Sequence, residues 1–210
     1  MIIEQIEVGN FAVFSYLLAC PRSGVGVVVD PAAEVNRILA VAEQKGVSQI
    51  KYIINTHCHA DHAGGNRELK ERSGARILVH REDGDRLANP SDFILQIFQC
   101  EASPPADLLL EDDQVIQFGE ESLKVIHTPG HTPGGICLYT PGYVITGDTL
   151  FVGAVGRTDL PGGSYEQMIH SIRTRLLSLP KETIVLPGHN YGSAPQSTIA
   201  REERFNPFLS

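Results

Sequence analysis

Runs of apolar residues, some alternating with polar ones and some continuous, predict strands in both halves of the chain. In the first half we expect strands over 11–18, 25–29, 50–54 and 75–79, and the first two form a hairpin around a Pro-Arg-Ser-Gly turn. In the second half we expect strands over 114–118, 123–127, 135–139, 143–146 and 183–186. Two strand-rich halves favour a pair of sheets.

A different spacing, with apolar residues three and four apart, predicts helices between and outside these strands. The helices are expected at 32–44, 65–73, 164–179 and 197–205, the third opened by Ser164 with Gln167 in a capping box. The proline-containing stretch 81–107 is predicted as short helix and loop. We therefore expect an α+β fold, a sandwich of sheets covered by helices, in a single domain spanning 1–210.

Composition and charge limit the classes of partner and indicate the cellular compartment. The formal net charge is −8 and basic residues do not cluster, which argues against a nucleic-acid partner. The N-terminal apolar run is too short to cross a bilayer and lacks the features of a secretory signal, so we predict a cytoplasmic protein without a membrane partner. The scattered Cys20, Cys58, Cys100 and Cys137 are then expected to be free thiols.

An unusual concentration of metal-binding residue types follows the strand at 50–54. The sequence of this segment is His57-Cys58-His59-Ala60-Asp61-His62. In an extended segment His57 and His59 project to one side and can share an ion, while Cys58 faces the core. Asp61 and His62 would point to a second ion where the chain bends into the next helix. Imidazole and carboxylate donors suit Zn²⁺, Fe or Mn²⁺.

Three later residues of the same chemical kind lie at predicted junctions between strand and loop. His131 lies in Pro-Gly-His-Thr-Pro-Gly-Gly, Asp148 in Thr-Gly-Asp-Thr-Leu, and His189 in Pro-Gly-His-Asn-Tyr-Gly. The neighbouring glycines allow close backbone approach. If these strands end at one edge of the sandwich, the three side chains gather over one cleft. The remaining histidines at 80, 127 and 170 are predicted as ordinary surface or core residues.

The order THxHxDH, GH, GD, GH resembles the metallo-β-lactamase superfamily over about residues 10–205. The resemblance implies a four-layer αββα sandwich with two divalent metal ions as cofactors, zinc foremost and iron or manganese as alternatives. It assigns a first metal site to His57, His59 and His131, a second to Asp61, His62 and His189, and the carboxylate shared by both to Asp148. It also implies an acidic residue near the ligands at Asp30, which could alternatively cap the helix that follows.

Within the superfamily, the chain resembles the short, single-domain glyoxalase II (hydroxyacylglutathione hydrolase) group. Three segments carry this resemblance: Gly-Asp-Thr-Leu-Phe (147–151), Gly-Arg-Thr-Asp (156–159) and Pro-Gly-His-Asn-Tyr (187–191). That resemblance implies hydrolysis of a thioester such as S-lactoylglutathione by a metal-bridging hydroxide that Asp61 orients. It implies substrate contacts from Arg157 and Tyr191, although Arg157 could equally be an ion-pair partner of Asp159. The thiol carrier stays open.

Three alternatives share the fold. A persulfide dioxygenase would hold one iron with His57, His131 and Asp148, and a lactone or other ester hydrolase would use the same metal pair on a different substrate. A binding module without catalysis is the third. The sequence predicts neither the oligomeric state nor which metal ion is bound.

Overall fold

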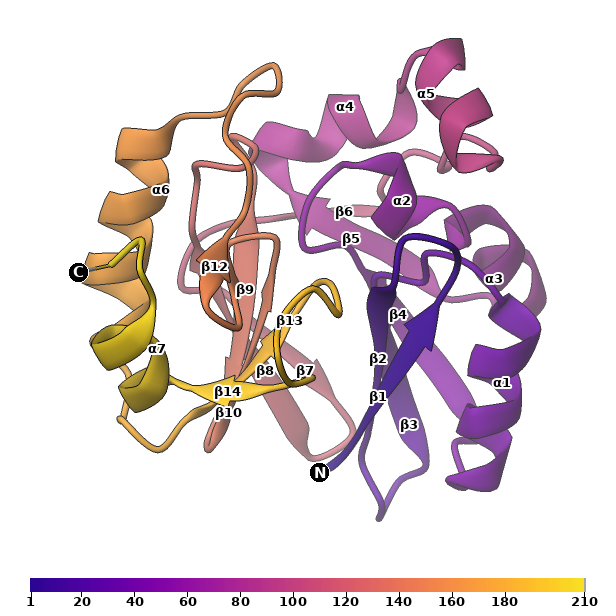
Figure 1. Ribbon diagram of the computed structural model, residues 1–210. Coiled ribbons are helices and arrows are strands. Elements are labelled where there is room, and N and C mark those ends of the chain that lie inside the picture. The colour runs from indigo at the N-terminus through magenta and orange to yellow at the C-terminus, as the bar shows by residue number, and fades with distance from the viewer. Residues whose placement is uncertain (210) are drawn as a thin grey trace.

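Two mixed six-stranded sheets pack face to face in the computed structural model, which describes residues 1–209, and helices cover both outer faces (Figure 1). This arrangement confirms the predicted helix-covered sandwich of the α+β class, in four layers. Within residues 1–209, every helix is too short or too polar to span a bilayer.

The first sheet holds the strands of the amino-terminal half of the chain in the order β1-β2-β3-β4-β5-β6. Its strands are β1 (Ile2–Val8), β2 (Val13–Ala19), β3 (Val25–Val29), β4 (Gln49–Ile54), β5 (Arg76–His80) and β6 (Leu108–Leu110). The predicted hairpin is the antiparallel pair β2 and β3, whereas β3, β4, β5 and β6 run parallel to one another. Strands β1 and β6 were not predicted.

The second sheet has the order β14-β13-β10-β9-β8-β7. Its strands are β7 (Val115–Phe118), β8 (Glu121–His127), β9 (Ile136–Thr140), β10 (Tyr143–Gly147), β13 (Ile184–Pro187) and β14 (Ser197–Thr198), and a separate ribbon pairs β11 (Leu150–Phe151) with β12 (Ala154–Val155). β9 runs antiparallel to both β8 and β10, and β10 runs parallel to β13. Strands β8, β10 and β13 therefore end at the same edge.

Helices lie outside each sheet and along one edge (Figure 1). They are α1 (Val35–Gln44), α2 (Ala60–Ala63), α3 (Asn66–Ser73), η1 (Arg81–Asp83), α4 (Gly84–Ala88), α5 (Asp92–Phe98), α6 (Tyr165–Ser171) with its π-helical continuation η2 (Ile172–Leu176), and α7 (Ile199–Phe205). Helix α6 begins as predicted, with the Ser164 hydroxyl accepting a hydrogen bond from the Gln167 N–H. Helix α1 begins at residue 35 rather than 32 because Glu34 has a left-handed φ of 52°.

The core forms three apolar layers, as four packed layers of backbone require. The inter-sheet layer includes Phe14, Tyr16 and Leu18 of β2, and the layer under α1 and α3 takes the intervening side chain of Leu17. Strand β2 is buried along its whole length, which explains its continuous apolar sequence. Cys58 is buried in the outer layer, as predicted, and all four cysteines are free. The sheets thus hold the strand ends rigidly at one edge.

Candidate metal centre

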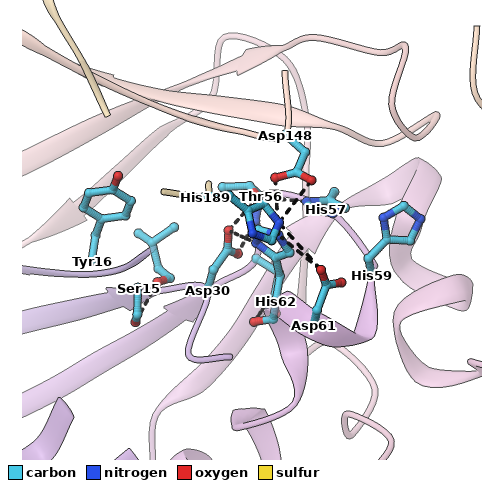
Figure 2. Close-up of polar contacts among 12 residues, drawn as sticks. Ser15, Tyr16, Asp30, Thr56, His57, His59, Asp61, His62, Asp148 and His189 are labelled. Carbon is cyan, nitrogen blue, oxygen red and sulfur yellow. Dashed lines mark hydrogen bonds and ion pairs between the residues drawn. The ribbon is translucent and has the colours of Figure 1, made fainter. Parts of the chain in front are cut away.

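The seven residues predicted as metal ligands meet at the edge where β4, β8, β10 and β13 end. The loop after β4 and helix α2 supply four of them, and the loops after β8, β10 and β13 supply one each: His57, His59, Asp61, His62, His131, Asp148 and His189. Figure 2 labels all of them except His131. Two groups within this cluster have ligand atoms that lie within 4.8 Å of one another, His57 with His59 and His131, and Asp61 with His62 and His189.

Asp148 lies between the two groups. Its Oδ2 is 3.5 Å from the Nε2 atoms of both His131 and His189, and its Oδ1 is 3.3 Å from Nε2 of His62. Asp61 joins the second group from below, with Oδ2 3.6 Å from Nε2 of His189 (Figure 2). One carboxylate therefore reaches donors of both groups, which is the place that the family resemblance gave to Asp148.

Backbone carbonyls orient two of the imidazoles. The Nδ1–H of His131 donates to the Arg157 carbonyl at 2.7 Å, and the Nδ1–H of His189 donates to the Phe11 carbonyl at 2.8 Å. With Nδ1 protonated, each ring presents the lone pair of Nε2 to the cluster. Hydrogen bonding at the distal nitrogen is how proteins fix the tautomer of a metal-binding histidine.

Asp30 orients two further imidazoles, those of His62 and His57, and does not cap α1. Its carboxylate accepts hydrogen bonds from the Thr56 N–H, the Thr56 hydroxyl and Nδ1–H of His62, at 2.8, 2.7 and 3.0 Å. The Thr56 oxygen in turn lies 3.1 Å from Nδ1 of His57. The capping alternative is wrong because Glu34, not Asp30, precedes the helix. Asp30 therefore supports the imidazoles of His57 and His62, and its own carboxylate also lies within 4.8 Å of their nitrogens.

Burial and neighbouring charge set the protonation of the cluster. Burial, together with the adjacent imidazoles, lowers the pKa of His57 well below its ordinary value and that of His59 to about 3, so both rings are neutral and able to coordinate. Burial alone would lower the pKa of His62, yet the carboxylates of Asp148 and Asp30 hold it well above its usual range. Burial would likewise raise the pKa of Asp148, but His62 and its neighbours hold it well below.

Two buried polar atoms show that these residues fit a cation. Nε2 of His57 is buried and has no hydrogen-bond partner among residues 1–209. Oδ1 of Asp148 also accepts no hydrogen bond within the described chain, although the Nε2 atom of His62 lies 3.3 Å away. A buried donor or acceptor left unpaired costs free energy, and a bound divalent ion would satisfy both atoms. The nitrogen and carboxylate donor set suits first-row transition metals.

Asp83 holds two of the predicted ligand loops together, a role that no sequence pattern indicates. The side chain is fully buried and accepts hydrogen bonds from the Cys58 N–H at 3.0 Å, the Thr132 hydroxyl at 2.7 Å and the Gly134 N–H at 2.9 Å. Cys58 lies between His57 and His59, and Thr132 follows His131. One carboxylate thus holds the neighbouring His57 and His59 in a fixed position relative to His131, which is distant in the chain.

Replacing Asp83 by asparagine is expected to weaken metal binding about 10–100-fold and to lower the free energy of unfolding by about 2 kcal/mol. The asparagine NH₂ group would face N–H and O–H donors that the carboxylate now accepts. Metal titration followed by thermal unfolding of the metal-free protein measures both effects. Asp85→Asn is the matched control because Asp85 is exposed on the adjacent turn. Equal metal affinity in both variants would show that Asp83 does not position the ligands.

The two residues predicted to contact substrate flank the cluster. The Arg157 side chain is 62% exposed and its guanidinium binds both carboxylate oxygens of Asp159 at 2.8 Å, so the ion-pair alternative holds for the free protein. The Tyr191 ring stacks on the His189 imidazole with centroids 4.4 Å apart and is 61% exposed. Both side chains are therefore available to a ligand at the mouth of the site.

Comparison with known proteins agrees with this geometry. The sequence profile described as the Metallo-beta-lactamase superfamily matches residues 8–189, which includes all seven clustered side chains. The chain belongs to this superfamily. A solved structure of TTHA1623 in a di-iron-bound form superposes with a TM-score of 0.86 at 34% identity, covering 98% of this chain and 100% of that one.

Two curated superfamily members with different activities are similar to the chain to nearly the same degree. The hydroxyacylglutathione hydrolase GloC of Haemophilus influenzae is 35% identical over 87% of this chain and 86% of its own length. The mitochondrial persulfide dioxygenase ETHE1 of Homo sapiens is 31% identical over 94% of this chain and 71% of its own length. Similarity therefore establishes the superfamily and leaves the reaction to be argued from the site.

Proposed function

We propose that the protein is a metal-dependent thioester hydrolase that cleaves S-acyl thiols such as S-lactoylglutathione into a carboxylic acid and a thiol. The observation that carries the proposal is the pair of three-ligand groups with Asp148 between them. His57, His59 and His131 would hold one ion, Asp61, His62 and His189 the other, and Asp148 both. Two divalent ions bound there would supply a water of lowered pKa and a Lewis acid for the carbonyl oxygen.

The chain's own residues would perform three tasks in this reaction. The Asp61 carboxylate, on α2 beside the cluster, accepts a hydrogen bond from the attacking water and orients it towards the carbonyl carbon. A carbon–oxygen bond forms, the carbon–sulfur bond breaks, and the proton released from the water neutralises the departing thiolate. Tyr191 and Arg157, exposed at the mouth, would contact the substrate outside the reacting bond.

The decisive experiment measures thiol release and oxygen uptake on the same metal-analysed preparation. With S-lactoylglutathione we expect thiol to appear in equal amount to the acid, and with glutathione persulfide we expect no oxygen consumption. A lactone panel run in parallel tests the ester alternative. Absence of thioester cleavage by protein that retains its full metal content would overturn the proposal.

The second candidate, a persulfide dioxygenase, is favoured by the similarity to human ETHE1 over 94% of the chain. In that reading one iron is held by His57, His131 and Asp148. The second group of Asp61, His62 and His189 would then hold no ion. We favour the hydrolase because the second group is as closely gathered as the first.

A single variant separates the two candidates. His189→Ala removes a ligand of the second group, and we expect a loss of about a hundredfold or more in kcat/KM for thioester cleavage because one metal contributes several kcal/mol to the transition state. A one-iron dioxygenase does not use this ligand and would keep its oxygen uptake. His170→Ala, at an exposed position on α6, is the control that should match the parent protein.

A further inference from the structure

A cavity of about 300 Å³ opens beside Asp61, between the β1–β2 turn, α2 and α5. Of the seven clustered side chains, Asp61 alone lines it within the described chain. Eight of its fourteen lining residues have hydrocarbon side chains, among them Phe11, Ile97 and Phe98. Asp61 therefore belongs to both the cavity wall and the cluster, and more than half of the lining residues carry hydrocarbon side chains.

The wall formed by the β1–β2 turn is fixed to the metal centre. Gly9 N–H donates to the Glu34 carboxylate at 2.8 Å, and the carbonyl of Phe11 accepts the hydrogen bond from His189. The Asn190 N–H also donates to the carbonyl of Ala12, at 2.9 Å. The turn thus orients the His189 ring through the Phe11 carbonyl, and hydrogen bonds at Gly9 and Ala12 hold the turn itself in place. Phe11 is therefore held next to the cluster.

The opposite wall is helix α5, whose apolar side chains are only partly covered by the rest of the described chain. Helix α5 has no buried residue within the described chain, yet it carries Phe93, Ile97 and Phe98. The Phe98 ring contacts the Phe11 ring edge-on with centroids 4.8 Å apart, so the two walls meet across the cavity. Ile97 is 44% exposed. Apolar groups left unburied beside a reaction centre are typical of a ligand-binding pocket.

The charged side chains that line the cavity indicate which part of a thioester fits there. Among residues 1–209, the charged side chains lining the cavity are Glu34 and Asp61, both carboxylates, and no basic side chain lines it. Hydrogen bonds from Gly9 and Arg37, against a smaller opposing effect of burial, keep the pKa of Glu34 below its ordinary value, so it is negatively charged. The described cavity wall therefore offers no cation to pair with the carboxylates of an anionic carrier such as glutathione. The nearest predicted cation for a carrier, Arg157, does not line the cavity.

We propose that this cavity receives the acyl chain of the substrate and selects thioesters whose acyl group is uncharged, apolar and several carbons long. The assignment rests on the proposed thioester hydrolysis. It places the acyl group against Phe11, Ile97 and Phe98, and it leaves the thiol carrier on the side of Arg157 and Tyr191. Acyl chain length, and not the identity of the thiol, then determines specificity.

The kinetic test varies one half of the substrate at a time. With N-acetylcysteamine as a constant thiol, kcat/KM is expected to rise about threefold to fourfold for each methylene added from acetyl to hexanoyl. Phe98→Ala should lower the value for the hexanoyl substrate about tenfold and leave the acetyl substrate within twofold. Ile97→Trp, which fills the cavity, should block long chains and spare short ones. Phe93→Ala is the matched control because Phe93 is on α5, 69% exposed, and does not line the cavity.

A binding measurement keeps the inference separate from catalysis. S-alkyl N-acetylcysteamine thioethers cannot be hydrolysed, and calorimetry should show affinity rising with alkyl length in the parent protein and in Phe93→Ala but not in Phe98→Ala. If alkyl length has no effect on binding or on kcat/KM, the acyl assignment is wrong while thioester hydrolysis stands. If Phe98→Ala instead changes kcat/KM when the thiol is varied under a constant acetyl group, the cavity holds the carrier and the assignment is also wrong. Length-dependent binding with no thioester cleavage overturns the proposed function alone.

Discussion

Asp148→Asn is expected to lower kcat/KM for thioester hydrolysis by about a thousandfold or more and to release at least one bound ion, because the metals that we propose this residue holds would contribute several kcal/mol of transition-state stabilisation. The carboxylate has atoms within 3.3–3.5 Å of His62, His131 and His189. An amide has one oxygen acceptor in place of two and carries no charge to balance the cations. Metal analysis of the purified variant and thiol-release kinetics measure the two effects.

Glu166→Gln provides the control for this substitution. Glu166 is an exposed carboxylate on α6, so its conversion to an amide removes the same charge far from the cluster and should change neither metal content nor rate by more than about twofold. An Asp148→Asn protein that keeps both its metal and its rate would show that Asp148 does not join the two groups. The two ligand groups would then not form one shared metal centre.

Gly188→Ala is expected to reduce metal binding and activity about a hundredfold although it changes no ligand. A Cβ atom at position 188 would collide with the Asp148 carboxylate and would lie 2.8 Å from the backbone of Gly147. Gly147 is the last residue of strand β10 and is paired with β13, so its backbone cannot move aside. The Asp148 carboxylate must therefore move away from its place between the two groups. Displacements of this size cost about a hundredfold in catalysis. Metal titration and kcat/KM report the loss.

Gly74→Ala distinguishes this crowding from a general effect of losing a glycine. Gly74 ends helix α3 with a positive φ of 69°, and an added Cβ would meet nothing within 4 Å. We expect this variant to lose about 1 kcal/mol of stability and to keep its metal. Equal metal affinity in Gly188→Ala and Gly74→Ala would mean that close approach at position 188 is not needed.

The part of the fold that could be predicted from sequence is the part that local patterns determine. Apolar runs and helical spacing located most elements, and the His-rich segment after β4 located the centre because its donors are adjacent in the chain. Strand β1 (Ile2–Val8) was missed because Glu4 and Glu7 interrupt its apolar residues, as an edge strand permits. The start of α1 was placed too early because periodicity does not report the left-handed φ of Glu34.

The supporting residues could not be predicted because their role comes from contacts between distant segments. Asp83 reaches Cys58 and Gly134 across 25 and 51 residues, and its own surroundings, a loop rich in charged residues, resemble an exposed turn. Asp30 had two readings from sequence, and its contact with Thr56, 26 residues away, decided between them. Likewise the cavity depends on α5 lying over the β1–β2 turn, a placement that no local pattern encodes.

Anomalous diffraction from a crystal of the metal-loaded protein locates the bound ions and so shows whether the seven clustered residues form one two-metal centre. We predict two peaks about 3.5–4 Å apart. One should be coordinated by His57, His59 and His131, the other by Asp61, His62 and His189, with Asp148 between them. A single peak held by His57, His131 and Asp148, or a fully loaded protein without density at this cluster, would show that the seven residues do not form a two-metal centre.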